Sequence, residues 1–281
     1  MKWNHLKGKN FISKFQKAMA LYPREKMTIH LGAEKEDEEN QFRKLKTGQY
    51  ITIEKSLPEI KIQRLLRIAD QRFKKVSDRP LYIADEITLG DSVEKRHQLS
   101  GALAMLKKAK NLLQTNIGDE IAIIRQKTLL RRTWPMSEDH SRKLGHNASN
   151  LTWHQDSNPK HGNRAMIVLM ASLQDGFGEQ IPGLSIHNLE VNSFKGIYGY
   201  DGKKVEIFEK QAKEVDKNSQ IKRPRLNRGD MIIFDGLTFH RTYATETMTS
   251  PRDALLVRVV KPKDTQNFGE LQHIKLNIKK L

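Results

Sequence analysis

The segment Trp153-His154-Gln155-Asp156 carries two residues of metal-binding type, and they stand two positions apart. On a β-strand, side chains two positions apart project from the same face, so His154 and Asp156 would converge on one point. His240, which follows the apolar run 231–234, is expected to supply a second imidazole. Two histidines and one carboxylate form the facial triad of non-haem Fe(II) oxygenases, which leaves the opposite face of the metal open for O₂ and substrate.

An iron centre this open needs an electron source to activate O₂, and 2-oxoglutarate is the commonest one. It chelates the metal through its keto and C1 oxygens, and its distant C5 carboxylate needs a cation, preferably the bidentate fork of an arginine. Arg252 stands twelve positions after His240, just before the apolar strand expected over 254–260, and is the predicted cation. Thr242, two positions after His240, could donate its hydroxyl to the same carboxylate. Arg258 shares a strand face with Arg252 and is the alternative cation.

Each of these features is common by itself, but the ordered set of HxD, a distant His and an Arg at a strand start is far more specific. One alternative is a triad that holds another metal, as in a cupin-type isomerase or a manganese enzyme. Such enzymes need no clamp for a cosubstrate, so Arg252 argues against this alternative. The other alternative is a basic jelly-roll binding module for nucleic acid or an anionic surface, without catalysis, which would not require the ordered set.

Six segments between residues 120 and 262 follow the pattern of one enzyme family in order: WHQDS (153–157), Leu173–Asp175, Pro182–Ile186, Arg228–Phe234, His240–Thr242 and Met248–Arg252. On these segments the chain resembles the phytanoyl-CoA dioxygenase-like family of Fe(II)/2-oxoglutarate-dependent oxygenases. The resemblance implies that His154, Asp156 and His240 bind Fe(II) and that Arg252 binds 2-oxoglutarate. Thr242 stands where the family commonly has Ser or Thr.

The resemblance also implies a dioxygenase reaction, in which 2-oxoglutarate and O₂ give succinate and CO₂ while a small-molecule substrate is hydroxylated. Related iron halogenases have a small residue in place of the carboxylate ligand, which frees a site for chloride. Asp156 is present here, so hydroxylation is expected rather than halogenation.

The elements that must position these residues change in character along the chain. Helical periodicity predicts helices at 11–21, 56–76 and 92–114. After about residue 118, short apolar runs between turn-rich segments predict a sandwich or barrel with strands at 120–131, 164–173, 183–191, 230–236 and 254–260. The resemblance implies, more specifically, a mainly β core with α: a double-stranded β-helix (jelly roll, cupin-like) with an N-terminal helical layer.

We therefore expect three parts along the chain. Residues 1–118 would form a helical layer packed on the core rather than an independent domain. Residues 119–265 would form the double-stranded β-helix catalytic core, and residues 266–281 a basic C-terminal tail.

The chain is strongly basic, with 50 Lys and Arg against 33 Asp and Glu and a formal net charge of +17. A basic protein attracts anions in general. Period-two alternation would put Arg125, Lys127 and Arg131 on one strand face, where they could bind an anionic substrate at the mouth of the barrel. The alternative is an exposed edge strand protected by charge. No nucleic-acid-binding motif accompanies the charge, so the expected partner is a small, anionic metabolite rather than nucleic acid.

The absence of cysteine excludes disulfides, thiolate nucleophiles and iron–sulfur clusters. No apolar run approaches the roughly 18 residues of a membrane-spanning helix. The N-terminal sequence lacks the apolar core and cleavage site of a signal peptide, so a cytoplasmic location is expected. The sequence indicates neither the identity of the substrate nor the oligomeric state.

Overall fold

A computed structural model gives the fold of the 281-residue chain. The structure describes residues 50–73, 84–89, 93–135, 154–157, 166–187, 221–245, 247–248, 250–268 and 273–281. The chain divides into two compact units, Met1–Glu36 and Asp37–Leu281, and all described residues belong to the second. The helix predicted over 11–21 lies outside the described residues.

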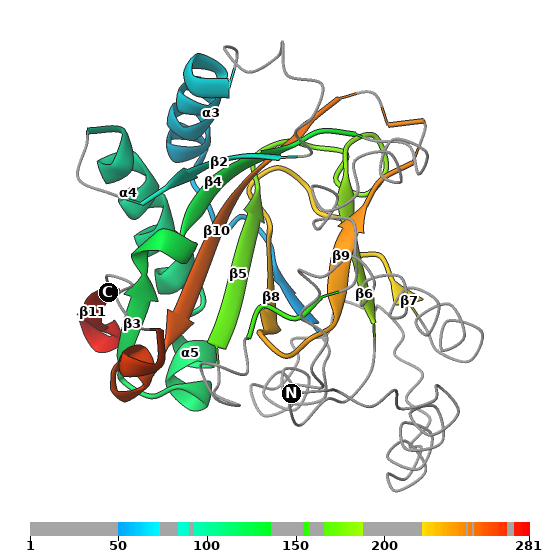
Figure 1. The fold of residues 1–281 in the computed structure, drawn as a ribbon. Coiled ribbons are helices and arrows are strands. Elements are labelled where there is room, and N and C mark those ends of the chain that lie inside the picture. The colour runs from blue at the N-terminus through cyan, green and yellow to red at the C-terminus, as the bar shows by residue number, and fades with distance from the viewer. Residues whose placement is uncertain are drawn as a thin grey trace, which may run out of the picture. The chain divides into compact units, whose positions relative to one another are not determined.

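Two antiparallel sheets form the core of the second unit (Figure 1). The main path of the larger, eight-stranded sheet runs through β1 (Tyr50–Ile53), β8 (Met231–Asp235), β5 (Met166–Ser172), β10 (Arg252–Val260), β3 (Glu120–Ile124) and β11 (His273–Asn277). Beside this path, β10 also pairs with β4 (Leu129–Thr133), which pairs with β2 (Ala84–Thr88). The smaller sheet contains β7 (Ile221–Lys222), β6 (Gly183–His187) and β9 (His240–Tyr243).

All residues of β10 are buried. Because successive side chains of a strand point to opposite sides of its sheet, both faces of β10 are covered. Leu255, Val257 and Val259 belong to a first apolar core, which includes residues of the helices. Ala254, Leu256 and Val260 belong to a second core, which includes Leu184 and Ile186 of the smaller sheet. The even-numbered positions of β10, Arg252 and Arg258 among them, therefore face the space between the sheets.

The helices α3 (Glu59–Phe73), α4 (Val93–Lys108) and α5 (Lys110–Asn116) lie on the other face of the larger sheet (Figure 1). Their apolar residues share the first core with the strands; Leu65 of α3, for example, joins Leu169 and Leu255. The helices predicted over 56–76 and 92–114 are thus confirmed, the second being interrupted at Ala109. Within the described ranges, none of the helices is long and apolar enough to cross a membrane.

The predicted fold class, a mainly β jelly roll with a helical layer, is confirmed by the two facing sheets and the helices on the outer face. Residues before 118 also supply two strands of the larger sheet, β1 and β2. The segment expected as a basic tail contains β11, whose alternating Ile274 and Leu276 pack against the first core. The part boundaries at residues 118 and 265 remain a prediction.

The single strand expected over 120–131 is wrong, because residues Arg125–Lys127 form a 3-10 turn, η2, between β3 and β4. The turn is closed by Thr128, whose backbone N–H donates to the carbonyl of Arg125 at 3.1 Å and whose hydroxyl donates to the carbonyl of Ile124 at 3.0 Å. Period-two alternation therefore does not run through Arg125, Lys127 and Arg131.

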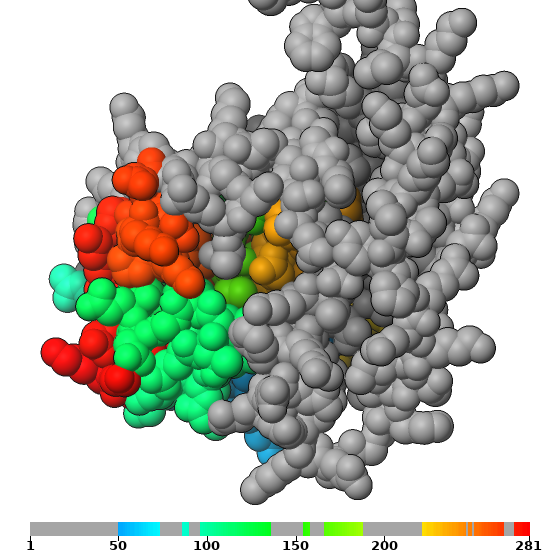
Figure 2. All heavy atoms as spheres, turned by 90° about the horizontal axis from the view of Figure 1, so that it is seen from below, coloured from blue at the N-terminus to red at the C-terminus, as the bar shows by residue number. Residues whose placement is uncertain are grey.

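The end of the unit near the last residues is built from segments distant in sequence. Figure 2 views this end and shows residues 262–268 (η5, Pro262–Phe268, orange) and the C-terminal residues (red) gathered beside the green residues of α5 and β3. The backbone N–H of Ile278 donates to the carbonyl of Asp119 at 2.8 Å, which fixes the C-terminal segment to the start of β3.

A buried ion pair connects the helical layer to the sheet. Arg132 of β4 donates two hydrogen bonds to Asp253 of β10, both at 2.7 Å, and a third to Asp70 of α3 at 2.8 Å. The Asp253 side chain has no exposed surface. We expect Arg132→Met to lower the free energy of unfolding by about 3–5 kcal/mol, because it leaves this buried carboxylate unpaired.

Urea denaturation of the purified protein measures this effect. The control is Arg225→Met, which breaks an ion pair with Glu179 whose side chains are 79% and 45% exposed, and which should cost at most about 1 kcal/mol. Adding Asp253→Asn to Arg132→Met should recover part of the loss. Equal effects of the two single substitutions would contradict a structural role for the buried pair.

Candidate metal centre

The segment 154–157 is attached at both ends to the stretch that leads into β9. His154 and His240 form an isolated antiparallel bridge, in which each backbone N–H donates to the other's carbonyl, at 2.9 and 3.0 Å. Three residues after His154, the backbone N–H of Ser157 donates to the carbonyl of Gly236 at 2.9 Å. The side-chain amide of Gln155 donates to the carbonyl of Leu237. A bridge and a bend, rather than the expected strand, position the HxD pair.

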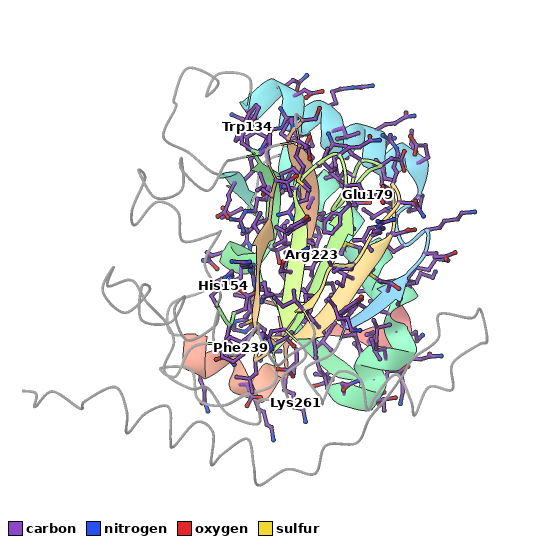
Figure 3. The ribbon with its side chains drawn as sticks, turned by 90° about the vertical axis from the view of Figure 1, so that its right-hand side faces the viewer. Trp134, His154, Glu179, Arg223, Phe239 and Lys261 are labelled. Atoms are coloured by element: carbon purple, nitrogen blue, oxygen red, sulfur yellow. The ribbon has the colours of Figure 1, made fainter. Side chains whose placement is uncertain are left out.

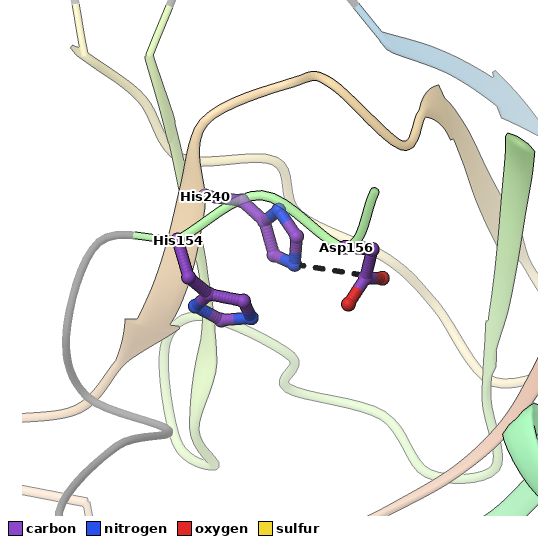
Figure 4. Close-up of side chains that lie close together, drawn as sticks. All are labelled: His154, Asp156 and His240. Carbon is purple, nitrogen blue, oxygen red and sulfur yellow. Dashed lines mark ion pairs between the residues drawn. The ribbon is translucent and has the colours of Figure 1, made fainter. Parts of the chain in front are cut away.

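His154, Asp156 and His240 each offer a ligand atom, and these atoms lie within 4.8 Å of one another (Figure 4). The Nε2 atom of His240 is 4.0 Å from an oxygen of Asp156. The two imidazole rings have centroids 4.3 Å apart and are tilted by 51°. The structure thus brings together the three residues that the sequence predicts as metal ligands. Two imidazoles and a carboxylate suit a divalent transition metal such as iron.

His240 is held in an orientation suited to ligation. Its Nδ1 atom is 3.0 Å from the carbonyl of Thr238, so Nδ1 carries the proton and Nε2 presents its lone pair toward Asp156. The ring of Phe234 packs against it with a centroid distance of 4.7 Å. Burial, with a contribution from His154, lowers the pKa of His240 to about 3. The imidazole is therefore neutral, which is the form that binds a metal.

Asp156 is paired with Arg258, and each side chain is 9% exposed. Nε of Arg258 donates to Oδ2 of Asp156 and Nη2 donates to Oδ1, both at 3.0 Å. Nη1 donates to the backbone carbonyl of Lys127 at 2.8 Å. Burial alone would raise the pKa of Asp156, but the charge of Arg258 and the nearby imidazoles hold it well below its usual range. The carboxylate is thus ionised and ready to bind a cation.

Arg252 is a buried cation that lacks an anionic partner among the described residues. It is 2% exposed, and it donates to the carbonyl of Gly183 at 2.8 Å and to the hydroxyl of Thr133 at 3.1 Å. Its Nε atom is buried without a hydrogen-bond acceptor. The neighbouring carboxylate, Asp253, is bound by Arg132. Burial lowers the pKa of Arg252 to about 9. A buried anion at this position would satisfy the guanidinium.

Thr242 lies near the position that Arg252 reaches. It is buried on the same face of β9 as His240, in the alternating pattern of that strand. Thr242 pairs with Leu184 and the next residue, Tyr243, pairs with Gly183, whose carbonyl accepts from Arg252. Thr242 and Arg252 therefore approach the same part of the smaller sheet.

The three predicted substrate contacts lie differently. Lys127 is partly buried, and its backbone carbonyl accepts a hydrogen bond from Arg258. Its pKa is lowered mainly by burial and also by the charge of Arg258, while Asp156 opposes the shift. Arg131 of β4 pairs with Ala254 of β10. It stands two positions after Leu129, which belongs to the second core. Its side chain is 11% exposed and pairs with Glu86 at 3.3 Å, while its Nη2 atom is buried without an acceptor. Arg125 begins η2 and is half-buried.

The contact between Arg258 and Asp156 was not predicted from the sequence. The available signal was the position of Arg258 on the inward face of a strand whose residues from 254 onward are otherwise apolar. Figure 3 shows His154 and Phe239 toward the end where Lys261 follows β10, while Trp134, which follows β4, lies toward the opposite end. Arg258 precedes Lys261 and Arg252 pairs with Thr133, so the two arginines act at different levels of β10.

No protein-family model and no curated protein matches the chain. Several solved structures are similar in fold. The non-haem α-ketoglutarate-dependent epimerase SnoN from nogalamycin biosynthesis matches with a TM-score of 0.50 and 13% identity, covering 80% of this chain and 82% of that chain. The carbocyclase SnoK from the same biosynthesis gives 0.51 and 11%, covering 79% and 83%.

AviO1 from Streptomyces viridochromogenes Tue57 gives a TM-score of 0.51 and 12% identity, covering 80% of this chain and 96% of that chain. SnoN has also been solved in complex with Fe³⁺, α-ketoglutarate and nogalamycin RO. At these identities the likeness concerns the fold: this chain shares the jelly roll of proteins described as non-haem α-ketoglutarate-dependent enzymes.

Proposed function

We propose that this protein is a non-haem Fe(II)- and 2-oxoglutarate-dependent dioxygenase that hydroxylates a small, anionic metabolite. His154, Asp156 and His240 would hold Fe(II), and Arg252 with Thr242 would hold the C5 carboxylate of 2-oxoglutarate. The observation that carries the proposal is the combination of a largely buried ligand triad, in which His240 is fully buried, with a buried arginine that lacks an anion among the described residues. The phytanoyl-CoA dioxygenase-like pattern of motifs supports the same assignment.

Arg252 fits the cosubstrate better than Arg258, the alternative cation. Each of the three guanidinium nitrogens of Arg258 already donates a hydrogen bond, two to Asp156 and one to the carbonyl of Lys127. Arg252 is bound only by neutral oxygens and has an unsatisfied Nε. A carboxylate beside it would form a charge-assisted hydrogen bond where the described residues supply none.

Bound iron and 2-oxoglutarate would supply an oxidant for a C–H bond, with O₂ and 2-oxoglutarate converted to succinate and CO₂. The chain's own contribution is geometry and shielding. Thr238 fixes the tautomer of His240, Arg258 fixes Asp156, and the ring of Phe234, a member of the second core, covers one side of His240. SnoN, which has this fold, is described in complex with Fe³⁺ and α-ketoglutarate, which supports the same pair here.

Hydroxylation is the proposed outcome, but related folds carry out others, since SnoN is an epimerase and SnoK a carbocyclase. Fold therefore does not choose the reaction. Iron-loaded protein should be incubated with 2-oxoglutarate, O₂ and a substrate library, with succinate as the readout. Mass spectrometry then distinguishes a gain of one oxygen atom from an unchanged mass or a loss of hydrogen. Folded, iron-loaded protein that forms no succinate, with or without a substrate, would contradict the proposed activity.

The proposed anionic substrate would be bound by Lys127 and Arg131, with Arg125 at the start of the same turn. We expect Lys127→Met or Arg131→Met to raise the KM for the substrate more than it lowers kcat, because the loss is mainly one of binding. The native KM should also rise with salt, since attraction at the surface is screened over about 8 Å at physiological ionic strength. Steady-state kinetics at two salt concentrations measure both effects. A neutral substrate that turns over independently of salt would contradict this prediction.

Two further expectations remain predictions: a cytoplasmic location, and membership of the phytanoyl-CoA dioxygenase-like family. The competing function, a basic binding module without catalysis, predicts that the charge reversal of exposed lysines weakens nucleic-acid or anionic-surface binding while Fe(II) has no effect. Nucleic-acid binding whose affinity is the same with and without metal and 2-oxoglutarate would favour the binding module over the enzyme.

A further inference from the structure

We propose that Arg258 is a positioning residue of the metal centre, which holds the Asp156 carboxylate so that it binds the metal through one oxygen. This inference rests on the proposed function and adds a residue to it. In this role Arg258 does not contact the metal; it acts through Asp156.

The first support is the geometry of the pair. The guanidinium places Nε and Nη2 against the two oxygens of Asp156, each at 3.0 Å, and its third nitrogen, Nη1, donates to the backbone carbonyl of Lys127 at 2.8 Å. A planar guanidinium presents these donors in a rigid fork. Because all three guanidinium nitrogens donate, rotation of the guanidinium or a tilt of the carboxylate would break a charge-assisted hydrogen bond.

The second support is the difference between the two backbones. Arg258 belongs to a nine-residue strand and pairs with Val168 of β5 in the middle of the larger sheet. Asp156 lies in a short bend, with His154 bridged before it and Ser157 bonded after it. The side chain of Asp156 therefore gains its orientation from the sheet through Arg258, rather than from its own segment.

The third support is what the pair does to the carboxylate as a ligand. Each oxygen of Asp156 already accepts from Arg258, so chelation of a metal by both oxygens would compete with these hydrogen bonds. Ligation through one oxygen leaves them intact and keeps one more coordination position for cosubstrate or O₂. The guanidinium also offsets the buried negative charge while no cation is bound, because an unpaired buried carboxylate is costly.

The test compares Arg258→Met and Arg258→Lys with the native protein in anaerobic titrations with Fe(II) and with Co(II), whose visible absorption reports the coordination geometry. Arg258→Met should weaken metal binding by about 10- to 100-fold, the usual effect of removing a hydrogen-bond partner of a ligand. Its Co(II) spectrum should also change. Arg258→Lys should recover part of the affinity, because an ammonium can donate to one oxygen but cannot form the fork. Arg252→Met is the matched control and should leave the metal affinity and spectrum unchanged.

Native affinity and a native Co(II) spectrum in Arg258→Met would overturn the inference. Thermal unfolding of the metal-free variants shows whether each is folded. If Arg258→Met does not fold, Arg258→Lys decides the question, and native affinity with a native spectrum there would overturn it equally. A native protein that binds neither metal would instead refute the proposed function, so the two failures are distinguishable.

Discussion

His240→Ala is expected to abolish tight Fe(II) binding and all 2-oxoglutarate turnover. The three candidate ligand atoms lie within 4.8 Å of one another, and the described residues offer no other such group in the second unit. Two ligands hold iron poorly, so the loss of any one of His154, Asp156 or His240 should have the same consequence. Metal content after anaerobic loading and succinate formation measure the two effects separately.

His187→Ala is the matched control for this substitution. His187 is also a buried histidine, 3% exposed, and its backbone N–H donates to the carbonyl of Phe239. It lies outside the cluster of three candidate ligands. We expect this variant to retain metal. A chelator should inactivate the native protein, and Fe(II) should restore it whereas redox-inert Zn(II) should not. Full activity of His240→Ala would remove that residue from the centre.

Arg252→Met is expected to raise the 2-oxoglutarate requirement by at least about tenfold while metal binding survives. Removing one partner of a buried charged pair costs roughly 3–5 kcal/mol, and about 1.4 kcal/mol already corresponds to a tenfold change. The same substitution should not lower the unfolding temperature of the protein without cosubstrate. Without cosubstrate, Arg252 is 2% exposed and has no carboxylate partner among the described residues. Methionine removes this buried charge and with it the cost of desolvating it.

Thermal unfolding with and without 2-oxoglutarate separates these effects. A ligand that binds only the folded state raises its stability, so 2-oxoglutarate should raise the unfolding temperature of the metal-loaded native protein and not of Arg252→Met. Arg252→Lys, which keeps the charge but loses the fork, should fall between the two. An undiminished shift in Arg252→Met would show that the cosubstrate carboxylate binds elsewhere.

The sequence was sufficient to predict the residues whose spacing follows a local rule. His154 and Asp156 stand two apart, His240 follows an apolar strand, and the structure gathers these three into one cluster. The helices α3 and α4 and the strands β5, β8 and β10 were predicted from periodicity or apolar runs, because their burial repeats along the chain. The roles of the cluster and of Arg252 remain predictions.

Other features depend on contacts between distant segments and leave little local signal. β1 and β2 are short strands of mixed polarity whose partners, β8 and β4, come much later in the chain. The η2 turn interrupts an otherwise strand-like run, because Thr128 bonds back to Ile124 and Arg125. The Arg258–Asp156 pair depends on how the 154–157 segment, which is bonded to residues 236 and 240, lies relative to β10, and residue spacing does not encode this.

The most direct test of the central claim is an anaerobic titration of the native protein with Fe(II) and then 2-oxoglutarate, followed by visible absorption. Chelation of Fe(II) by the keto and C1 oxygens produces a weak metal-to-ligand charge-transfer band. We predict that the band appears only when both are present, that His240→Ala does not form it, and that Arg252→Met forms it only at higher 2-oxoglutarate. Folded native protein that binds Fe(II) but shows no band at saturating 2-oxoglutarate would contradict the assignment.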